Sequence, residues 1–81
     1  SRVNLTESNL SKANLTGANL NQADLYKSDL SETNLSSTNL SLSRLTLSNL
    51  SGAKLNNTNL TDAELFKTNF KNTDLNNTSL K

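Results

Sequence analysis

Eighty-one residues are enough for one domain, and eight Lys and Arg against seven Asp and Glu leave a net charge of +1 at pH 7. Charges of both signs are interspersed, so there is no basic footprint for DNA or RNA and no polybasic segment for an anionic membrane. The absence of His and Cys removes the imidazole base, the thiolate nucleophile, the soft-metal site and the disulfide framework. We therefore expect no enzyme, no cofactor and no bound metal.

Leucine recurs at every fifth position, and one Phe interrupts the series. On an α-helix a step of five rotates each side chain by about 140° and scatters the column around the axis. On a flat strand a step of five is odd, so successive leucines would face opposite sides. Only a chain that turns a corner once per repeat sends the whole column to one side, which predicts a coiled solenoid. Its expected core is Leu5, Leu10, Leu15, Leu20, Leu25, Leu30, Leu35, Leu40, Leu45, Leu50, Leu55, Leu60, Leu65, Phe70, Leu75 and Leu80.

The residue two positions before each Leu is small or β-branched, from Val3 and Ser8 to Thr73 and Thr78. Residues two apart in an extended segment share a face, so each repeat points one small and one large side chain inward. The residue between them points outward and is polar throughout, Asn at nine positions and Asp at three. Asn and Asp suit a place beside a corner because their side chains hydrogen-bond nearby backbone groups.

These repeats resemble the pentapeptide-repeat family, which is widespread in bacteria and has the motif A(N/D)LXX. The matching segments are ANLTG at 13–17, ANLNQ at 18–22, ADLYK at 23–27 and AELFK at 63–67. The resemblance implies an all-β fold, a right-handed quadrilateral β-helix with four repeats per coil and with Leu and the small residue inside. We expect a single domain over residues 1–81, with sixteen repeats in four coils of about 20 residues and no separate capping element.

Charged residues indicate the register of the stack. Residues one coil apart lie about 4.8 Å from each other, where opposite charges attract and like charges repel. At a spacing of 20 all five charged pairs are opposite, whereas spacings of 15 and 25 include like pairs. A coil of 20 residues is therefore favoured. The five pairs are Glu7–Lys27, Lys12–Glu32, Asp24–Arg44, Arg44–Glu64 and Lys54–Asp74.

The corners differ in composition from side to side. One set of corner residues tolerates a positive φ, which a type II turn needs at its third position; this set is Gly17, Ser37, Asn57 and Asn77. Another set contains no residue that favours this conformation, so we expect a different turn type there. Its members are Glu7, Lys27, Leu47 and Lys67.

On one side of the solenoid, several outward-facing residues are apolar rather than polar. These apolar residues follow Leu or lie at a corner and form a candidate contact patch of Tyr26, Leu47, Phe66 and Leu42. Isolated apolar residues on a surface are normal, so a scatter without function is the alternative.

Asp62 and Glu64 flank a corner and offer oxygen ligands for a hard cation. The nearby Lys67 and Arg44 favour a solvated ion-pair face instead.

A solenoid exposes its core at both ends and normally carries caps. The repeats run from Val3 to Leu80, so either further protein covers the ends or the ends pair with another copy. Phe70 is the only aromatic residue in the large inward column. The last layer is therefore a candidate end interface for a homodimer, formed by Phe70, Leu75 and Leu80.

The favoured function is a non-enzymatic structural or interaction module, a rigid β-helical rod that contacts an unknown protein partner or a second copy. The longest apolar run is two residues, so we expect no transmembrane helix or signal peptide and a cytoplasmic location. The resemblance adds an alternative, because some family members act on DNA gyrase by mimicking duplex DNA, a role that implies a strongly acidic surface. Ice binding is a further alternative, although Asn21, Lys71 and Lys81 interrupt the outward Ser and Thr columns.

Overall fold

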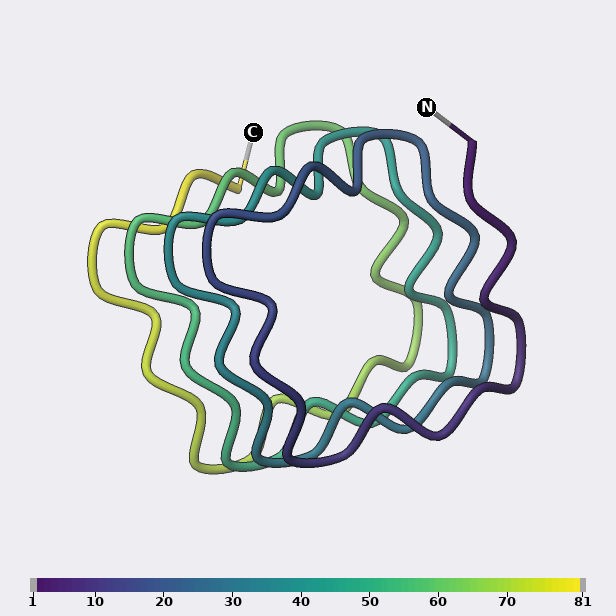
Figure 1. Ribbon diagram of the computed structural model, residues 1–81, viewed down its shortest axis with the longest axis horizontal. Coiled ribbons are helices and arrows are strands. Elements are labelled where there is room, and N and C mark those ends of the chain that lie inside the picture. The colour runs from purple at the N-terminus through teal and green to yellow at the C-terminus, as the bar shows by residue number, and fades with distance from the viewer. Residues whose placement is uncertain (1, 81) are drawn as a thin grey trace.

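The computed structural model describes residues 2–80 and shows a solenoid whose successive turns lie side by side (Figure 1). Parallel bridges join residues 20 apart, from the pair Asn4 and Asp24 to the pair Asn59 and Ser79. The observed register is therefore the one that the charged pairs favour. We refer to residues 3–22, 23–42, 43–62 and 63–80 as layers 1 to 4. The successive five-residue segments of each layer lie on sides one to four, and side one runs down the right of Figure 1.

Hydrogen bonds run from layer to layer, and no helix and no strand longer than one bridge residue occurs within residues 2–80. The bridge residue always directly precedes a residue of the inward column, which is Leu or, at position 70, Phe. Asp24 donates its N–H to the carbonyl of Val3 at 2.8 Å, and Leu25 donates to the carbonyl of Arg44 at 2.8 Å. Each side is this short because a five-residue repeat must also turn a corner.

The corners all adopt one conformation at their third residue. Thirteen non-Gly residues and Gly17 and Gly52 have φ between 56° and 73°. The expectation of a different turn on the side that contains Glu7, Lys27, Leu47 and Lys67 is wrong, because their φ values are 56–61°. The left-handed region costs a non-Gly residue about 1–2 kcal/mol. The ladder offsets this cost, since Glu7 donates its N–H to the carbonyl of Tyr26 at 2.8 Å.

The outward Asn and Asp residues brace the corners. Each accepts, through Oδ1, the backbone N–H two residues on, at 2.9–3.2 Å. This bond explains why the repeat prefers Asn or Asp before Leu, as the sequence indicates. The bracing residues are Asn4, Asn9, Asn14, Asn19, Asp24, Asp29, Asn34, Asn39, Asn49, Asn59, Asn69 and Asp74. Arg44 and Lys54 have no side-chain acceptor and cannot make it.

The core is concentrated in the middle of the stack. Nine leucines are buried, namely Leu20, Leu25, Leu30, Leu35, Leu40, Leu45, Leu50, Leu55 and Leu60. Leu5, Leu10, Leu15, Leu65 and Phe70 are partly buried against them. Leu75 and Leu80 were expected in the core but are 39% and 54% exposed, because no further layer covers them in the structure.

Among residues 2–80, the hydroxyls of the fully buried Ser and Thr residues are bonded to backbone carbonyls, with one exception. Ser48 donates to the carbonyl of Leu45 at 2.7 Å, and Thr58 donates to the carbonyl of Leu35 in the preceding layer at 2.6 Å. Ser43 is fully buried, yet within residues 2–80 its Oγ has no hydrogen-bond partner. A buried polar group without a partner costs about 1–3 kcal/mol.

We expect Ser43→Ala to raise the free energy of unfolding by about 1 kcal/mol, because it removes the unbonded hydroxyl. Ala23 and Ala63 hold the equivalent places in the neighbouring layers, so a methyl group fits this column. Urea denaturation measures the change. Ser48→Ala is the matched control and should lower the stability, since its hydroxyl is bonded. A Ser43→Ala variant less stable than the wild type would refute the prediction.

The molecule is a block rather than the rod that the repeat number suggested. Its Cα extents are 25 × 22 × 20 Å. The layers add about 4.8 Å each along the stack, while the four sides spread the chain about as far across it. The consequence is that each side and each end is of similar size.

Candidate interaction surface

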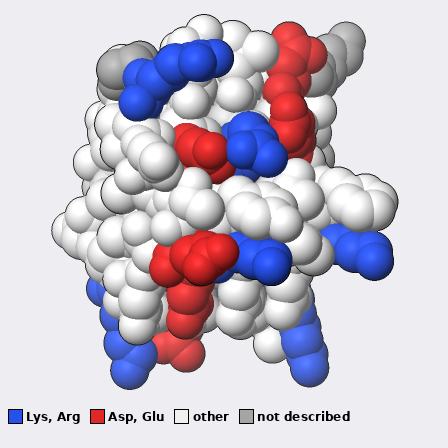
Figure 2. Space-filling view, turned by 90° about the vertical axis from the view of Figure 1, so that its right-hand side faces the viewer, with Lys and Arg blue, Asp and Glu red and all other residues white. Residues whose placement is uncertain are grey.

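Side one carries a column of charged groups. The outward residue before Leu is Asn4, Asp24, Arg44 and Glu64 in successive layers, and the ladder places them one above another. Arg44 Nη1 lies 2.9 Å from Asp24 Oδ2, and Arg44 Nε lies 3.3 Å from Glu64 Oε1. One guanidinium therefore bridges two carboxylates across three layers. Figure 2 shows acidic and basic groups intermixed on this face.

The electrostatics keep Arg44 charged. The Asp24 carboxylate, and next the hydrogen bond to Glu64, raises the pKa of Arg44 above its ordinary value. The side chain of Arg44 is 48% exposed. Exposed ion pairs contribute little to stability, so the stack defines the character of the surface more than it holds the fold together.

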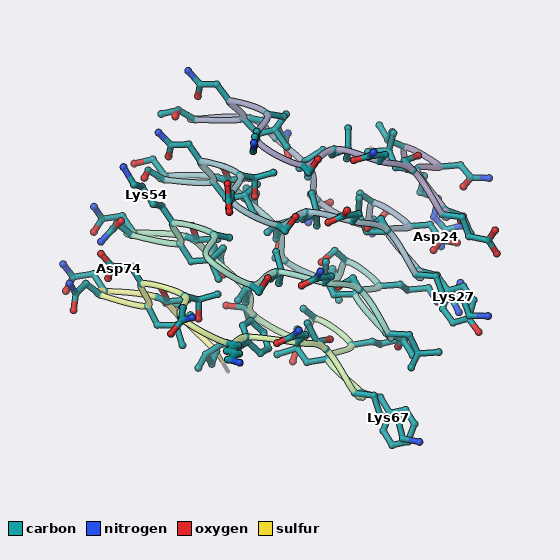
Figure 3. The ribbon with its side chains drawn as sticks, turned by 90° about the horizontal axis from the view of Figure 1, so that it is seen from below. Asp24, Lys27, Lys54, Lys67 and Asp74 are labelled. Carbon is teal, nitrogen blue, oxygen red and sulfur yellow. The ribbon has the colours of Figure 1, made fainter. Side chains whose placement is uncertain are left out.

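Aromatic rings flank the charged column. The Arg44 guanidinium carbon lies 5.4 Å from the Tyr26 ring centroid, and Lys27 Nζ lies 5.5 Å from the same ring. Lys67 Nζ lies 5.5 Å from the Phe66 centroid. Phe66 is 67% exposed, and Leu47 is also exposed. Figure 3 shows Lys27 and Lys67 projecting from the same side of the molecule.

Leu42 lies apart from the other three patch residues. It is 50% exposed at the corner before side one, where it lines a cleft of about 530 Å³. The structure thus places Tyr26, Leu47 and Phe66 on side one and Leu42 on the other flank of the charged column. The cleft is lined by Arg2, Val3, Asn4, Gln22, Asp24, Leu42, Arg44 and Glu64.

The role of Arg44 as the link between cleft, rings and carboxylates was not anticipated. The spacing of 20 between Asp24, Arg44 and Glu64 did signal the ion pairs. The other charged pairs are in register, but within residues 2–80 they show no N–O contact of 4.0 Å or less. Glu64 contacts Arg44, which favours the ion-pair reading over a cation site with Asp62. Residues 2–80 contain no group of three Asp or Glu side chains placed to hold a metal.

A family model described as pentapeptide repeats matches residues 4–41 and 43–81 in eight copies. The chain belongs to the pentapeptide-repeat family.

Solved structures show which relatives this pentapeptide-repeat protein is similar to. The pentapeptide repeat protein alr5209 from Nostoc Pcc 7120 has a TM-score of 0.92 and 31% identity, covering 95% of this chain and 64% of that chain. Rfr23 from the cyanobacterium Cyanothece 51142 has a TM-score of 0.73 and 35% identity, covering 96% and 64%. AT2G44920 from the Arabidopsis thaliana thylakoid lumen has a TM-score of 0.56, 23% identity and coverage of 88% and 57%, and shares the fold alone.

These relatives define the fold as a right-handed β-helix. The chain spans 64% of the length of each of the two cyanobacterial proteins. No protein of curated function matches it. No helix within residues 2–80 is long and apolar enough to cross a bilayer.

On side two of the solenoid, the carboxylate of Asp29 makes the stability of the fold depend on pH. The backbone N–H of Ser31 donates to Asp29 Oδ1 at 3.0 Å. This bond, and next the Ser31 hydroxyl, lowers the pKa of Asp29 below its ordinary value of 3.8. A carboxylate with a lowered pKa in the folded state adds stability above its unfolded pKa and loses it as the pH falls through the folded pKa.

We expect Asp29→Asn to remove this component, because an amide does not ionise. The variant keeps the Oδ1 acceptor, as Asn49 does in the next layer. The stability advantage of the wild type over the variant should therefore shrink as the pH falls below about 4. Urea midpoints of both proteins from about pH 6 to about pH 2 measure the difference. A difference that stays constant over this range would contradict the assignment. Glu32→Gln on the same side is the control.

At the edge of layer 4, backbone N–H groups lack an interlayer acceptor among residues 2–80, and apolar side chains are exposed. Leucines of layers 1 to 3 donate their N–H to the next layer, as Leu60 does to the carbonyl of Ser79 at 2.7 Å. Among residues 2–80, Leu65, Phe70 and Leu75 have no such backbone acceptor. With Leu75 and Leu80 exposed and Phe70 partly buried, the candidate end interface combines open backbone donors with apolar side chains.

Proposed function

We propose that this chain is a non-enzymatic structural and interaction module, a quadrilateral β-helix of four coils that associates with a second copy through its C-terminal end face. Members of the family are generally structural or interaction modules. The coil number is supported by the parallel bridges between residues 20 apart. The observation that carries the association is the layer 4 edge, where Leu75 and Leu80 are exposed beside N–H groups that have no backbone acceptor among residues 2–80.

The layer 4 edge suits a twofold contact. Two copies that meet there bury Leu65, Phe70, Leu75 and Leu80 of both chains, and the aromatic ring of Phe70 fills the centre of the layer better than a Leu would. A contact of a surface with itself closes after two copies and forms no fibre. The rigid ladder keeps these side chains in place before contact, which lowers the entropy that association costs.

Light scattering over a concentration series tests this proposal. The wild type should associate beyond the monomer, and Phe70→Asp should raise the dissociation constant of the end-face contact at least about tenfold, because a buried carboxylate without a partner is costly. Because Phe70 is partly packed on the core, circular dichroism must show that the variant folds. Leu80→Asp, at a more exposed position, is the second variant. A wild type that stays monomeric up to about millimolar concentration would overturn the proposal.

Neither alternative function gains support from the geometry. A DNA mimic needs continuous rows of carboxylates, whereas Arg44 interrupts the row of Asp24 and Glu64. An ice-binding face needs free hydroxyls, but Ser11, Ser41 and Thr61 donate theirs to Asn Oδ1 atoms. A supercoiling assay and a thermal-hysteresis measurement are the direct tests of the two.

A further inference from the structure

Side one has opposite charges on its two edges in layers 2 and 4. Asp24 and Glu64 precede the inward Leu, while Lys27 and Lys67 lie at the corner three residues later. Tyr26 and Phe66 lie between the acid and the base in each of these layers. Tyr26 and Lys27 are the two central residues of the corner turn, which the N–H of Ser28 closes by donating to the carbonyl of Leu25 at 3.0 Å. The side therefore presents an acidic edge, an aromatic centre and a basic edge in two of its layers.

Lys27 and Lys67 have no acidic partner among the described residues. Among residues 2–80, no carboxylate lies within 4.0 Å of either ammonium group. Lys27 rests instead over the Tyr26 ring and Lys67 over the Phe66 ring, each at 5.5 Å from the ring centroid. Figure 3 shows both residues at the outer margin of the side. Both ammonium groups can therefore meet a carboxylate of another molecule without breaking an ion pair.

The acidic edge has two carboxylates that pair with one guanidinium. Asp24 and Glu64 share Arg44, and Arg2 lines the adjoining cleft without an ion pair within 4.0 Å among residues 2–80. The Glu64 side chain is 62% exposed and contacts Arg44 through Oε1 alone at 3.3 Å. This edge therefore has capacity for further cations.

We propose that side one binds side one of a second copy of this chain about a twofold axis parallel to the solenoid axis. This axis places each layer of one copy against the same layer of the other copy. The acidic edge of each copy then lies opposite the basic edge of the other. Asp24 then faces Lys27 of the partner subunit, and Glu64 faces Lys67 of the partner subunit. Each pair occurs twice, and Tyr26 and Phe66 lie near the axis against their own counterparts. This surface is distinct from the end face of the proposed function.

The remaining layers do not oppose this pairing. In layer 1 Asn4 faces Glu7 of the partner subunit, and in layer 3 Arg44 faces Leu47 of the partner subunit. No like charges meet in any layer. The exposed Leu47 and Phe66 are covered in the same contact, which removes their apolar surface from water. The arrangement thus accounts together for the aromatic rings, the exposed Leu and the unpaired lysines.

The contact is small and electrostatic. With extents of 20–25 Å the side offers about 400 Å² per copy, the low end for a specific interface. We therefore expect a dissociation constant in the micromolar range or weaker that rises with salt, because exposed charge pairs are screened.

Variants on two sides of the molecule test the proposal. The background is Phe70→Asp, which disables the end face, so that the two contacts are measured apart. In this background the chain should still dimerise, and Lys27→Glu with Lys67→Glu should raise the dissociation constant at least about tenfold. The control is Lys12→Glu with Lys71→Glu, which changes the net charge equally on side two and should keep the dimer. Circular dichroism confirms folding of each variant.

The outcomes separate the two contacts. A Phe70→Asp protein that is monomeric at about millimolar concentration overturns the side-one contact and leaves the end-face proposal standing. A wild-type dimer that resists Phe70→Asp and Leu80→Asp but dissociates with the two lysine changes supports side one and overturns the end face. Equal weakening by the side-two control also overturns the side-one contact, since net charge alone would then explain the effect.

A cysteine probe tests the orientation, because the chain has no native Cys. Thr46 lies near the proposed axis, so Thr46→Cys should be cross-linked to its counterpart by a short bis-maleimide. Ser51→Cys, in the same layer and at the equivalent place on side two, should not be. Equal yields from the two variants would refute the proposed axis.

Discussion

Leu45→Ala is expected to lower the free energy of unfolding by about 2–5 kcal/mol, the range for a buried Leu whose cavity cannot collapse. Leu45 is fully buried, and hydrogen bonds hold its backbone to both neighbouring layers. Leu25 donates its N–H to the carbonyl of Arg44, and Leu45 donates its N–H to the carbonyl of Glu64, both at 2.8 Å. These bonds prevent the layers from closing around the cavity. Urea denaturation at neutral pH measures the loss.

The matched control is Leu47→Ala, which removes the same atoms two residues away in the same layer. Leu47 is 40% exposed at a corner, so this change should alter the stability by less than about 0.5 kcal/mol. Equal losses at the two positions would show that the interior column does not carry the stability. A domain of this size has about 5–10 kcal/mol in total, so the Leu45 variant would be close to unfolding.

Asn49→Pro is the second change with a large expected effect. Asn49 N–H donates to the carbonyl of Ser28 at 3.0 Å, and Pro has no N–H. The carbonyl of Ser28 loses its interlayer donor, and the Pro ring enters a ladder in which proline is normally confined to edges. We expect a loss of at least about 2 kcal/mol, measured as a lower urea midpoint.

Ser51→Pro is the control for this substitution. In this repeat the N–H groups of Asn49, Leu50, Gly52 and Ala53 all donate to backbone carbonyls. Ser51 N–H donates only to the side chain of Asn49 at 3.0 Å, and it holds the second position of a turn, where Pro is favoured. This variant should lose about 1 kcal/mol or less. A ladder proline that is tolerated as well as the corner proline would contradict the interlayer bonding.

Side one draws its properties from stacking rather than from any single repeat. Arg44 contacts an acid in the layer before and an acid in the layer after, and it also lies beside the ring of Tyr26. In an isolated repeat none of these groups would meet. A solenoid therefore builds a surface from residues that are 20 positions apart in the chain, and a substitution in one layer acts on its two neighbours.

The sequence by itself was sufficient for the solenoid, the inward Leu column, the register of 20 and the bracing role of Asn and Asp. These features follow from periodicity, because a side chain that recurs every fifth residue must meet the same surroundings each time. The Asp24–Arg44–Glu64 stack could be predicted for the same reason, since the register of 20 alone brings those charges together.

Only the tertiary structure decided the features that depend on several layers at once. Glu7 and Leu47 adopt a positive φ against their own preference, because interlayer bonds impose one corner on every side. Among residues 2–80, the hydroxyl of Ser43 has no hydrogen-bond partner, whereas that of Ser48 has one. Leu75 and Leu80 share the repeat pattern of Leu45 but lie exposed, since burial requires a layer on both sides. Propensity acts on one residue at a time, whereas burial and hydrogen bonding in a solenoid depend on the neighbouring layers.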